Sequence, residues 1–152
     1  MPAEPAALVH GHRWAPTEDA GPFAPFMGDA EDCSDAAFRE EYGGAEVDTG
    51  RCGRVALGQP LTSDVRAGDV LHVVAWHSAL LSHEPGTGHM ALALGDTVVW
   101  QVESPIPAAP ESYDVAFPSP VDAPAGTPVT LHVRNHGNNT WNLSTFTLEE
   151  TP

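Results

Sequence analysis

The sequence is poor in basic residues. It contains no lysine, six arginines and 21 acidic residues, which gives a formal net charge of −15 at pH 7. Nucleic acids and anionic membrane surfaces are bound through basic residues, so this balance predicts neither as a partner. Isoleucine occurs once, at Ile106. Together with the absence of lysine, this is typical of a GC-rich bacterial genome.

Long apolar runs are also absent. No stretch approaches the roughly 20 apolar residues of a membrane-spanning helix, so we expect no membrane insertion. The first residues, MPAEPAALVH, lack the basic segment and the full apolar segment of a signal peptide. Two alternatives remain: a cytosolic protein, or the mature segment of a protein that is secreted or attached to the cell surface.

Cysteine occurs only twice. Cys33 and Cys52 flank a segment rich in Gly, Asp and Glu. Two cysteines are too few for a structural zinc site unless histidines join them. A disulfide that closes this loop contributes about 3 kcal/mol by the chain-entropy estimate. We predict a Cys33–Cys52 disulfide, which favours an oxidising compartment and hence the secreted or cell-surface alternative.

Proline and glycine, in contrast, are plentiful. The 15 prolines and 14 glycines favour short elements and turns over long helices. A chain of 152 residues is long enough for one domain with a real core. Residues 1–32 are rich in Pro and Ala without sustained periodicity, and we interpret them as an N-terminal extension outside the core. Trp14, Phe23 and Phe26 are candidate anchors of this extension, and residues 33–152 are assigned to the folded domain.

The stretch from Gly68 to Val102 carries the clearest secondary-structure pattern. Residues 71–77 alternate between apolar and more polar side chains, the period of two expected for a strand. Residues 90–94 alternate in the same way. Gly95-Asp96 then predicts a tight two-residue hairpin into the next strand, residues 97–102.

Further strand-like runs lie on both sides of this stretch. Residues 34–48 fit a short helical turn or a first strand equally well, and residues 54–57 form a short apolar run. Residues 112–117, 129–134 and 141–148 alternate again. Roughly six or seven strands separated by turns predict an all-β fold, an antiparallel β-sandwich. The side chains in the apolar phase that we expect to be mostly buried are Trp100, Tyr113, Phe117, Leu131 and Val133.

The order of these features is also informative. A turn at Ala67-Gly68-Asp69 opens a strand that continues into Ala75-Trp76-His77, residues 113–118 (YDVAFP) place aromatic residues before a proline, and residues 139–148 (NTWNLSTFTL) follow a last turn. Over about residues 54–149, this order resembles the jelly-roll carbohydrate-binding modules with a galactose-binding-like fold, which are appended to secreted polysaccharide-degrading enzymes. The resemblance implies that fold and a polysaccharide or glycan partner. Asn142 stands near the position where these modules usually have an aspartate.

Strand phase defines a candidate ligand face. If the apolar residues of each strand face the core, a set of polar and aromatic residues faces outward, and strands that share a sheet present this set together. These residues are His72, Trp76, His89, His132 and Arg134. An aromatic ring with hydrogen-bonding side chains suits a sugar, which offers apolar C–H faces and hydroxyls. The alternative is a solvated face whose His and Arg side chains shield a partly buried Trp76.

The eight histidines also allow a metal site, because imidazoles suit zinc or copper. The candidate ligands are His77, His83, His89 and His136. None of the tight spacings of known zinc motifs is present, and His77 falls in the inward phase, where a hydrogen-bonded buried histidine is the alternative. His10 and His12 form a second, looser candidate pair.

The sequence evidence for a catalytic site is weaker than that for a ligand face or a metal site. Ser78 and Ser82 lie near histidines without a G-x-S-x-G elbow, and Glu84 and Asp96 are not recognisable as an acid–base pair. We therefore predict no enzyme activity. The sequence favours a non-catalytic β-sandwich that binds a carbohydrate. The alternatives are a His-dependent Zn or Cu protein and a structural or interaction domain without a small ligand, and the sequence does not determine the oligomeric state.

Overall fold

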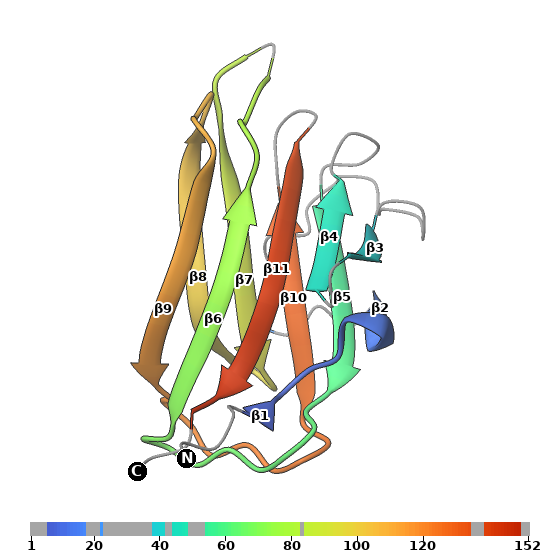
Figure 1. Cartoon of the computed structure of the whole chain (residues 1–152), viewed down its shortest axis with the longest axis vertical. Helices are drawn as coiled ribbons and strands as arrows, with labels where there is room; N and C mark the ends of the chain where they lie inside the picture. Colours follow the sequence, from blue (N-terminus) through green and yellow to red (C-terminus); the bar gives the residue numbers. More distant parts are fainter. Residues whose placement is uncertain are drawn as a thin grey trace.

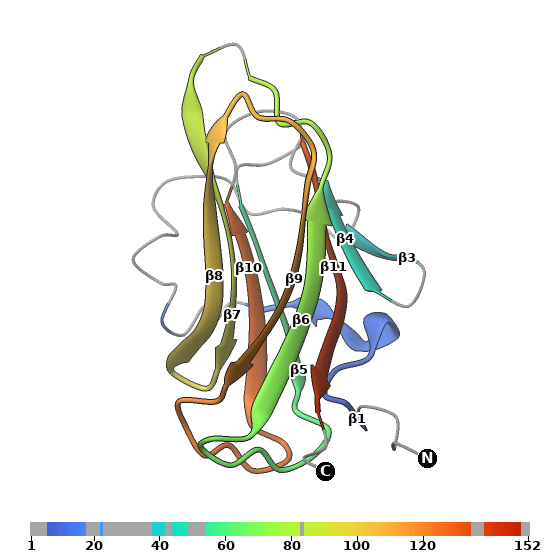
Figure 2. The ribbon, with the colours of Figure 1, turned by 60° about the vertical axis from the view of Figure 1, so that its left-hand side comes forward.

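Two antiparallel β-sheets packed face to face make up the structure, a computed structural model (Figures 1 and 2). The residues it describes are 6–17, 22, 38–41, 44–48, 54–82, 84–134 and 139–149. This architecture confirms the predicted antiparallel β-sandwich. No helix within the described ranges has the length and hydropathy needed to cross a bilayer.

The first sheet, here called sheet A, has the strand order β3-β4-β11-β6-β9. A short strand, β1, pairs with one end of β11. The bounds are β1 Ala6–Ala7, β3 Phe38–Glu41, β4 Gly44–Asp48, β6 Val70–His77, β9 Glu111–Pro118 and β11 Thr140–Leu148. Of the two alternatives for residues 34–48, the strand is confirmed in its described part, β3 and β4.

The second sheet, sheet B, has the order β2-β5-β10-β7-β8. The bounds are β2 Ala15–Pro16, β5 Arg54–Pro60, β7 Gly86–Leu94, β8 Thr97–Ile106 and β10 Pro128–Arg134. The predicted hairpin is confirmed, because Leu94 of β7 pairs with Thr97 of β8. Gly95 in the turn has a φ of 57°, a conformation that glycine adopts at low cost.

The core lies between the sheets, where each long strand turns its apolar phase inward. Three of the residues predicted for the core, Trp100, Leu131 and Val133, are buried. The other two, Tyr113 and Phe117, pack against the core but stay partly exposed. Both belong to β9, which is an edge strand of sheet A.

The described part of the N-terminal extension contributes two short strands and buried side chains to the sandwich, which the prediction of a segment outside the core did not include. β1 joins sheet A and β2 joins sheet B, with the 3₁₀ turn η1 (Gly11–Arg13) between them. Leu8 and Trp14 are buried in the core cluster. Trp14 is therefore confirmed as an anchor, whereas Phe23 and Phe26 lie outside the described residues.

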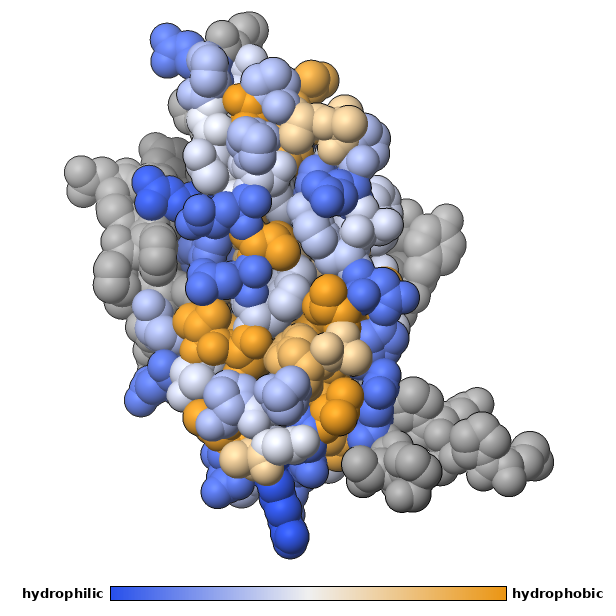
Figure 3. Space-filling view, turned by 90° about the vertical axis from the view of Figure 1, so that its left-hand side faces the viewer, coloured by the Kyte–Doolittle hydropathy of each residue, from blue (hydrophilic) through white to orange (hydrophobic). Residues whose placement is uncertain are grey.

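The opposite side of the sandwich, between edge strands β8 and β9, carries partly exposed apolar side chains. Val99 and Val102 of β8 and Phe117 of β9 are only partly covered, and Val115 is 36% exposed. Figure 3 shows apolar residues gathering in the lower half of this side, with polar residues around them. The sandwich is thus bridged by the N-terminal segment on one side and open on the other.

Candidate functional site

The predicted ligand face is divided between the two sheets. His72 and Trp76 lie on β6 of sheet A, whereas His89, His132 and Arg134 lie on β7 and β10 of sheet B. All five are in the outward phase of their strands, as predicted. However, the outward faces of two packed sheets point away from each other, so the expectation of one shared face is wrong.

The sheet B residues lie side by side. In the strand register, His132 is opposite Ala91 and Arg134 is opposite His89. The Nδ1 atoms of His89 and His132 are 3.3 Å apart, and His89 Nε2 is 3.1 Å from Oε1 of Gln101. Both histidines are buried, although they point away from the core. They therefore do not form the exposed surface that a stacked sugar requires.

The outer face of sheet A, in contrast, presents an exposed aromatic ring. Trp76 is 43% exposed and lies opposite Ser112 on β9 and Asn142 on β11. Asn142 is in turn opposite Glu46 on β4, and Glu46 is opposite Arg39 on β3. One row of polar side chains with a tryptophan among them therefore crosses sheet A from β9 to β3. At about 4.8 Å per strand, this row is roughly 19 Å long.

Two features of the row bear on ligand binding. Arg39 Nε donates to Oε2 of Glu46 at 3.1 Å, so the far end of the row is held by an ion pair. The Nδ2 group of Asn142 is buried and has no hydrogen-bond partner among the described residues. A buried donor without a partner costs free energy that a hydrogen-bonding group can recover.

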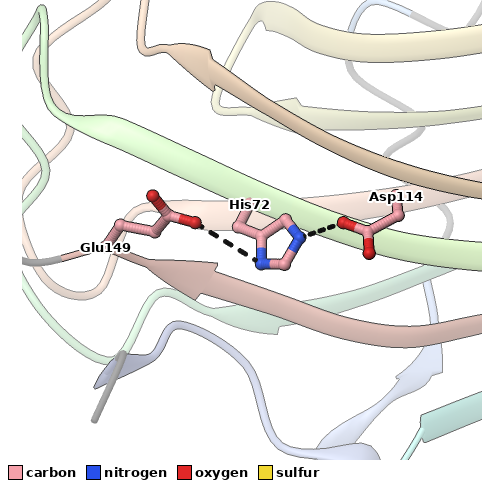
Figure 4. A network of polar contacts seen from close by, with 3 residues as sticks. All are labelled: His72, Asp114 and Glu149. Atoms are coloured by element: carbon pink, nitrogen blue, oxygen red, sulfur yellow. Dashed lines mark hydrogen bonds and ion pairs between the residues drawn. The ribbon is translucent and has the colours of Figure 1, made fainter.

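A polar network borders this row toward the other end of β6 (Figure 4). His72 lies between two carboxylates, with Nε2 in contact with Oδ1 of Asp114 and Nδ1 3.7 Å from Oε1 of Glu149. The three side chains come from β6, from β9 and from the residue that follows β11. The network thus connects three neighbouring segments of sheet A and gives the face an acidic border.

The two predicted metal ligands that the structure describes, His77 and His89, are not brought together. His77 is buried on the inward side of β6, where Nδ1 donates to the carbonyl oxygen of Ser78 at 2.8 Å and Nε2 lies 3.2 Å from the Tyr113 hydroxyl. The alternative of a buried, hydrogen-bonded histidine is therefore confirmed for His77. His89 lies on the other sheet, while His83 and His136 lie outside the described residues. In the described part of the chain, no three His, Cys, Asp or Glu side chains form a potential metal site.

The other candidate residues can be placed only in part. His10 lies in the segment between β1 and η1, where its backbone N–H and C=O both bond the side-chain amide of Gln59 at 2.9 Å. The side chain of His12 is not described, and the cysteines of the predicted disulfide, Cys33 and Cys52, lie outside the described residues.

One titratable group near the site has a shifted pKa. Burial raises the pKa of Tyr113, and the negative charge of Glu111, together with a hydrogen bond to it, raises this pKa further. The Tyr113 hydroxyl donates to Oε2 of Glu111 at 3.3 Å. The phenol therefore stays protonated in the folded protein at a higher pH than a free tyrosine does.

Sequence reasoning missed three members of the row: Ser112, Glu46 and Arg39. Only Asn142 had a signal, its place near the aspartate of carbohydrate-binding modules. The others belong to strands far apart in the sequence, and no local pattern connects them with Trp76.

No protein-family model matches this chain, and no curated protein sequence matches it. Solved structures do resemble it. A structure described as "CBM4 structure and function" superposes with a TM-score of 0.51 at 13% identity, over 96% of this chain and 95% of that chain. The arabinose-bound α-L-arabinofuranosidase MgGH51 also gives a TM-score of 0.51, at 14% identity, over 95% of this chain but 26% of that chain.

At these identities the similarity concerns the fold. The chain has the β-sandwich fold of carbohydrate-binding modules, as its strand and turn order predicted.

Proposed function

We propose that the protein binds a glycan on the outer face of sheet A, with Trp76 as the stacking platform. The observation that carries this proposal is the exposure of Trp76 within the polar row from Ser112 to Arg39. Buried tryptophans are explained by the core, whereas a tryptophan that is 43% exposed on a regular sheet presents its ring to a ligand. Sugar rings have apolar C–H faces that pack against such a ring.

The row supplies the polar contacts that a sugar needs beside the stacked ring. The exposed Ser112 lies beside Trp76 on β9, and Asn142, which is buried, lies beside it on β11. Both side chains donate and accept hydrogen bonds, as sugar hydroxyls do. A row of roughly 19 Å accommodates several sugar units laid across the strands.

Charge restricts the class of glycan. The chain has a net charge of −15, and Asp114, Glu149 and Glu46 lie on or beside the face. Like charges repel a polyanionic ligand and slow its approach. We therefore expect neutral polysaccharides to bind and polysaccharides rich in uronic acid or sulfate not to bind.

The decisive variant is Trp76→Ala. Loss of a stacking anchor commonly costs 2 kcal/mol or more, so affinity should fall by roughly thirtyfold or more. Titration calorimetry with the best ligand from a panel of neutral polysaccharides measures this loss. Trp76→Tyr should retain part of the affinity because an aromatic ring remains.

A matched control separates stacking from general apolar adhesion. Leu81 is 63% exposed and lies in the segment that follows β6, so it is not one of the residues of the row. Leu81→Ala should bind the same glycan as tightly as the unmodified protein. Equal losses in the two variants would indicate non-specific adhesion, and an unchanged affinity in Trp76→Ala would reject the proposed face.

The proposal includes binding without chemical change, at a secreted or cell-surface location where polysaccharides are found. Incubation with the bound glycan should release no new reducing ends. Fractionation of the producing cells should place the protein outside the cytoplasm.

A further inference from the structure

A cavity of about 260 Å³ lies beside the proposed glycan face. The cavity exists because two strands, β4 and β1, pair with the same edge of β11, each along a different part of it. β4 pairs with residues 140–143 and β1 pairs with residues 147–148 of β11, so the segment between them is paired with neither strand. Figure 1 shows β4 and β1 beside different parts of β11. We call this cavity the notch.

The walls of the notch are fixed by backbone contacts. Ser144 is a bulge residue, because the register between β11 and β6 shifts between Leu143 and Thr145. The N–H of Leu8 donates to the carbonyl oxygen of Phe146 at 3.0 Å. On the opposite wall, β4 approaches so closely that a Cβ on Gly44 would lie 2.3 Å from the carbonyl oxygen of Leu143. Backbone contacts between the strands therefore fix the shape of the notch.

The lining of the notch is mixed, with more apolar than polar surface. The apolar part includes Val9, Trp14 and Phe146, and the polar part includes Glu40, Thr145 and Thr147. The hydroxyl of Thr147 is buried and has no hydrogen-bond partner among the described residues. A lining that combines apolar surface with hydroxyl groups suits a sugar ring, which has apolar C–H faces and hydroxyls, whereas Glu40 opposes an anionic ligand.

The position of the notch relates it to the row on sheet A. Thr145 and Thr147 are opposite Val74 and His72 on β6, in the outward phase that also contains Trp76. The notch thus opens next to the glycan face, to one side of the row and not at its end. A cavity of this size is just below the range of about 300–1,000 Å³ typical for drug-sized ligands, so it fits a single sugar unit.

We propose that the notch binds a neutral single-sugar side branch of a glycan whose main chain lies along the row from Ser112 to Arg39. This inference rests on the proposed function, because the main chain must occupy that row. It predicts a preference for branched over linear glycans with the same main chain. A gain of about tenfold in affinity is expected from roughly two additional neutral hydrogen bonds.

The test compares matched pairs of neutral oligosaccharides by titration calorimetry. Suitable pairs are cello- with xyloglucan oligosaccharides, xylo- with arabinoxylo-oligosaccharides, and manno- with galactomanno-oligosaccharides. The variant Ala7→Trp places a large side chain in the notch, which Ala7 lines. Its control is Ala6→Trp, because Ala6 is the exposed neighbouring residue of β1 and is not part of the lining. Thermal unfolding verifies that both variants fold.

The inference is supported if the branched member of a pair binds about tenfold more tightly and only Ala7→Trp removes this preference. It is overturned if the unmodified protein binds both members equally, or if Ala7→Trp keeps the preference. In either case, a loss of affinity for the linear oligosaccharide in the Trp76→Ala variant still supports the glycan face on sheet A. If no oligosaccharide or polysaccharide binds the unmodified protein, the proposed function fails and the notch inference fails with it.

An NMR titration of the ¹⁵N-labelled full chain locates the branch directly. The branched ligand should shift the amide signals of Gly11, Ser144 and Thr145, which line the notch, as well as the indole signal of Trp76. The linear ligand should shift the Trp76 indole and signals of the row, but not the amides of the notch. A branched ligand that leaves the notch amides unchanged overturns the inference.

Discussion

The outward faces of the two sheets differ in their residues and in their surroundings. Sheet A presents Trp76 and Ala116 to solvent. On sheet B, the outward residues Ala91, Ala93 and His132 are fully buried. At these residues β6 and β9 of sheet A are packed on one side, whereas β7 and β10 of sheet B are packed on both. Only an outward face that is exposed to solvent can bind a ligand without rearrangement.

Small side chains are the sequence feature that accompanies the buried face. Ala56, Ala91 and Gln101 occupy one row with His132 across sheet B, and Ala93 follows on the next row. Alanine leaves room for other atoms close to the sheet. The outward face of sheet A carries larger side chains, among them Trp76, Thr145 and Thr147.

The largest expected effect concerns the side of sheet B that faces the core. Leu131 on β10 is fully buried, and Leu131→Ala should lower the free energy of unfolding by roughly 2–5 kcal/mol because it leaves a cavity. Urea denaturation measures this change. The outward residue Val74 of sheet A is half-buried, and Val74→Ala should cost clearly less. Similar losses in both variants would contradict the assignment of Leu131 to the inward side and of Val74 to the outward side.

A pair of alanines tests the outward faces themselves. Ala91 is fully buried on the outside of sheet B, so Ala91→Leu should destabilise the protein by about 1–3 kcal/mol through overpacking. Ala116 is exposed on the outside of sheet A, and Ala116→Leu should change stability by no more than about 0.5 kcal/mol. Thermal unfolding of the two variants under the same conditions gives the comparison. An unchanged melting temperature in Ala91→Leu would show that the sheet B face is loosely packed.

Strand phase could be predicted from the sequence because it is a local property. The alternation in residues 71–77 and 129–134 gave the inward and outward sides correctly, and Gly95-Asp96 gave the hairpin. Sheet membership is not local. β7 follows β6 in the sequence, yet β6 pairs with β9 and β11 while β7 lies in the other sheet. The predicted face assumed that these strands were neighbours, and this assumption mixed residues of both sheets.

The role of the N-terminal segment could not be predicted for a related reason. Leu8 and Trp14 are single apolar residues without periodicity, and their burial depends on pairing with β11 and β5, more than 40 residues away in the sequence. The same long-range pairing creates the notch. For this chain, residues that share a strand could be recognised from the sequence, whereas residues that share a site could not.

The smallest expected effect concerns the pH dependence of stability at the edge of sheet A. Tyr113 of β9 has a pKa raised above its usual value of about 10 by burial and by Glu111. The folded state therefore holds the phenolic proton more tightly than the unfolded state does. The resulting stabilisation is fully present below about pH 10 and is lost as the pH rises through the folded-state pKa.

The variant Tyr113→Phe removes this proton. It also removes the contacts of the hydroxyl with His77 and Glu111, so Tyr113→Phe should be somewhat less stable than the unmodified protein at pH 8. The stability difference should stay constant up to about pH 10 and shrink above it, because only the unmodified protein then loses the stabilisation from Tyr113. Urea midpoints of both proteins, measured between about pH 8 and 11, give this difference directly. A stability difference that stays the same over the whole pH range would show that the Tyr113 hydroxyl titrates alike in the folded and unfolded states. The inward side of β9 would then be as open to water as its outward side.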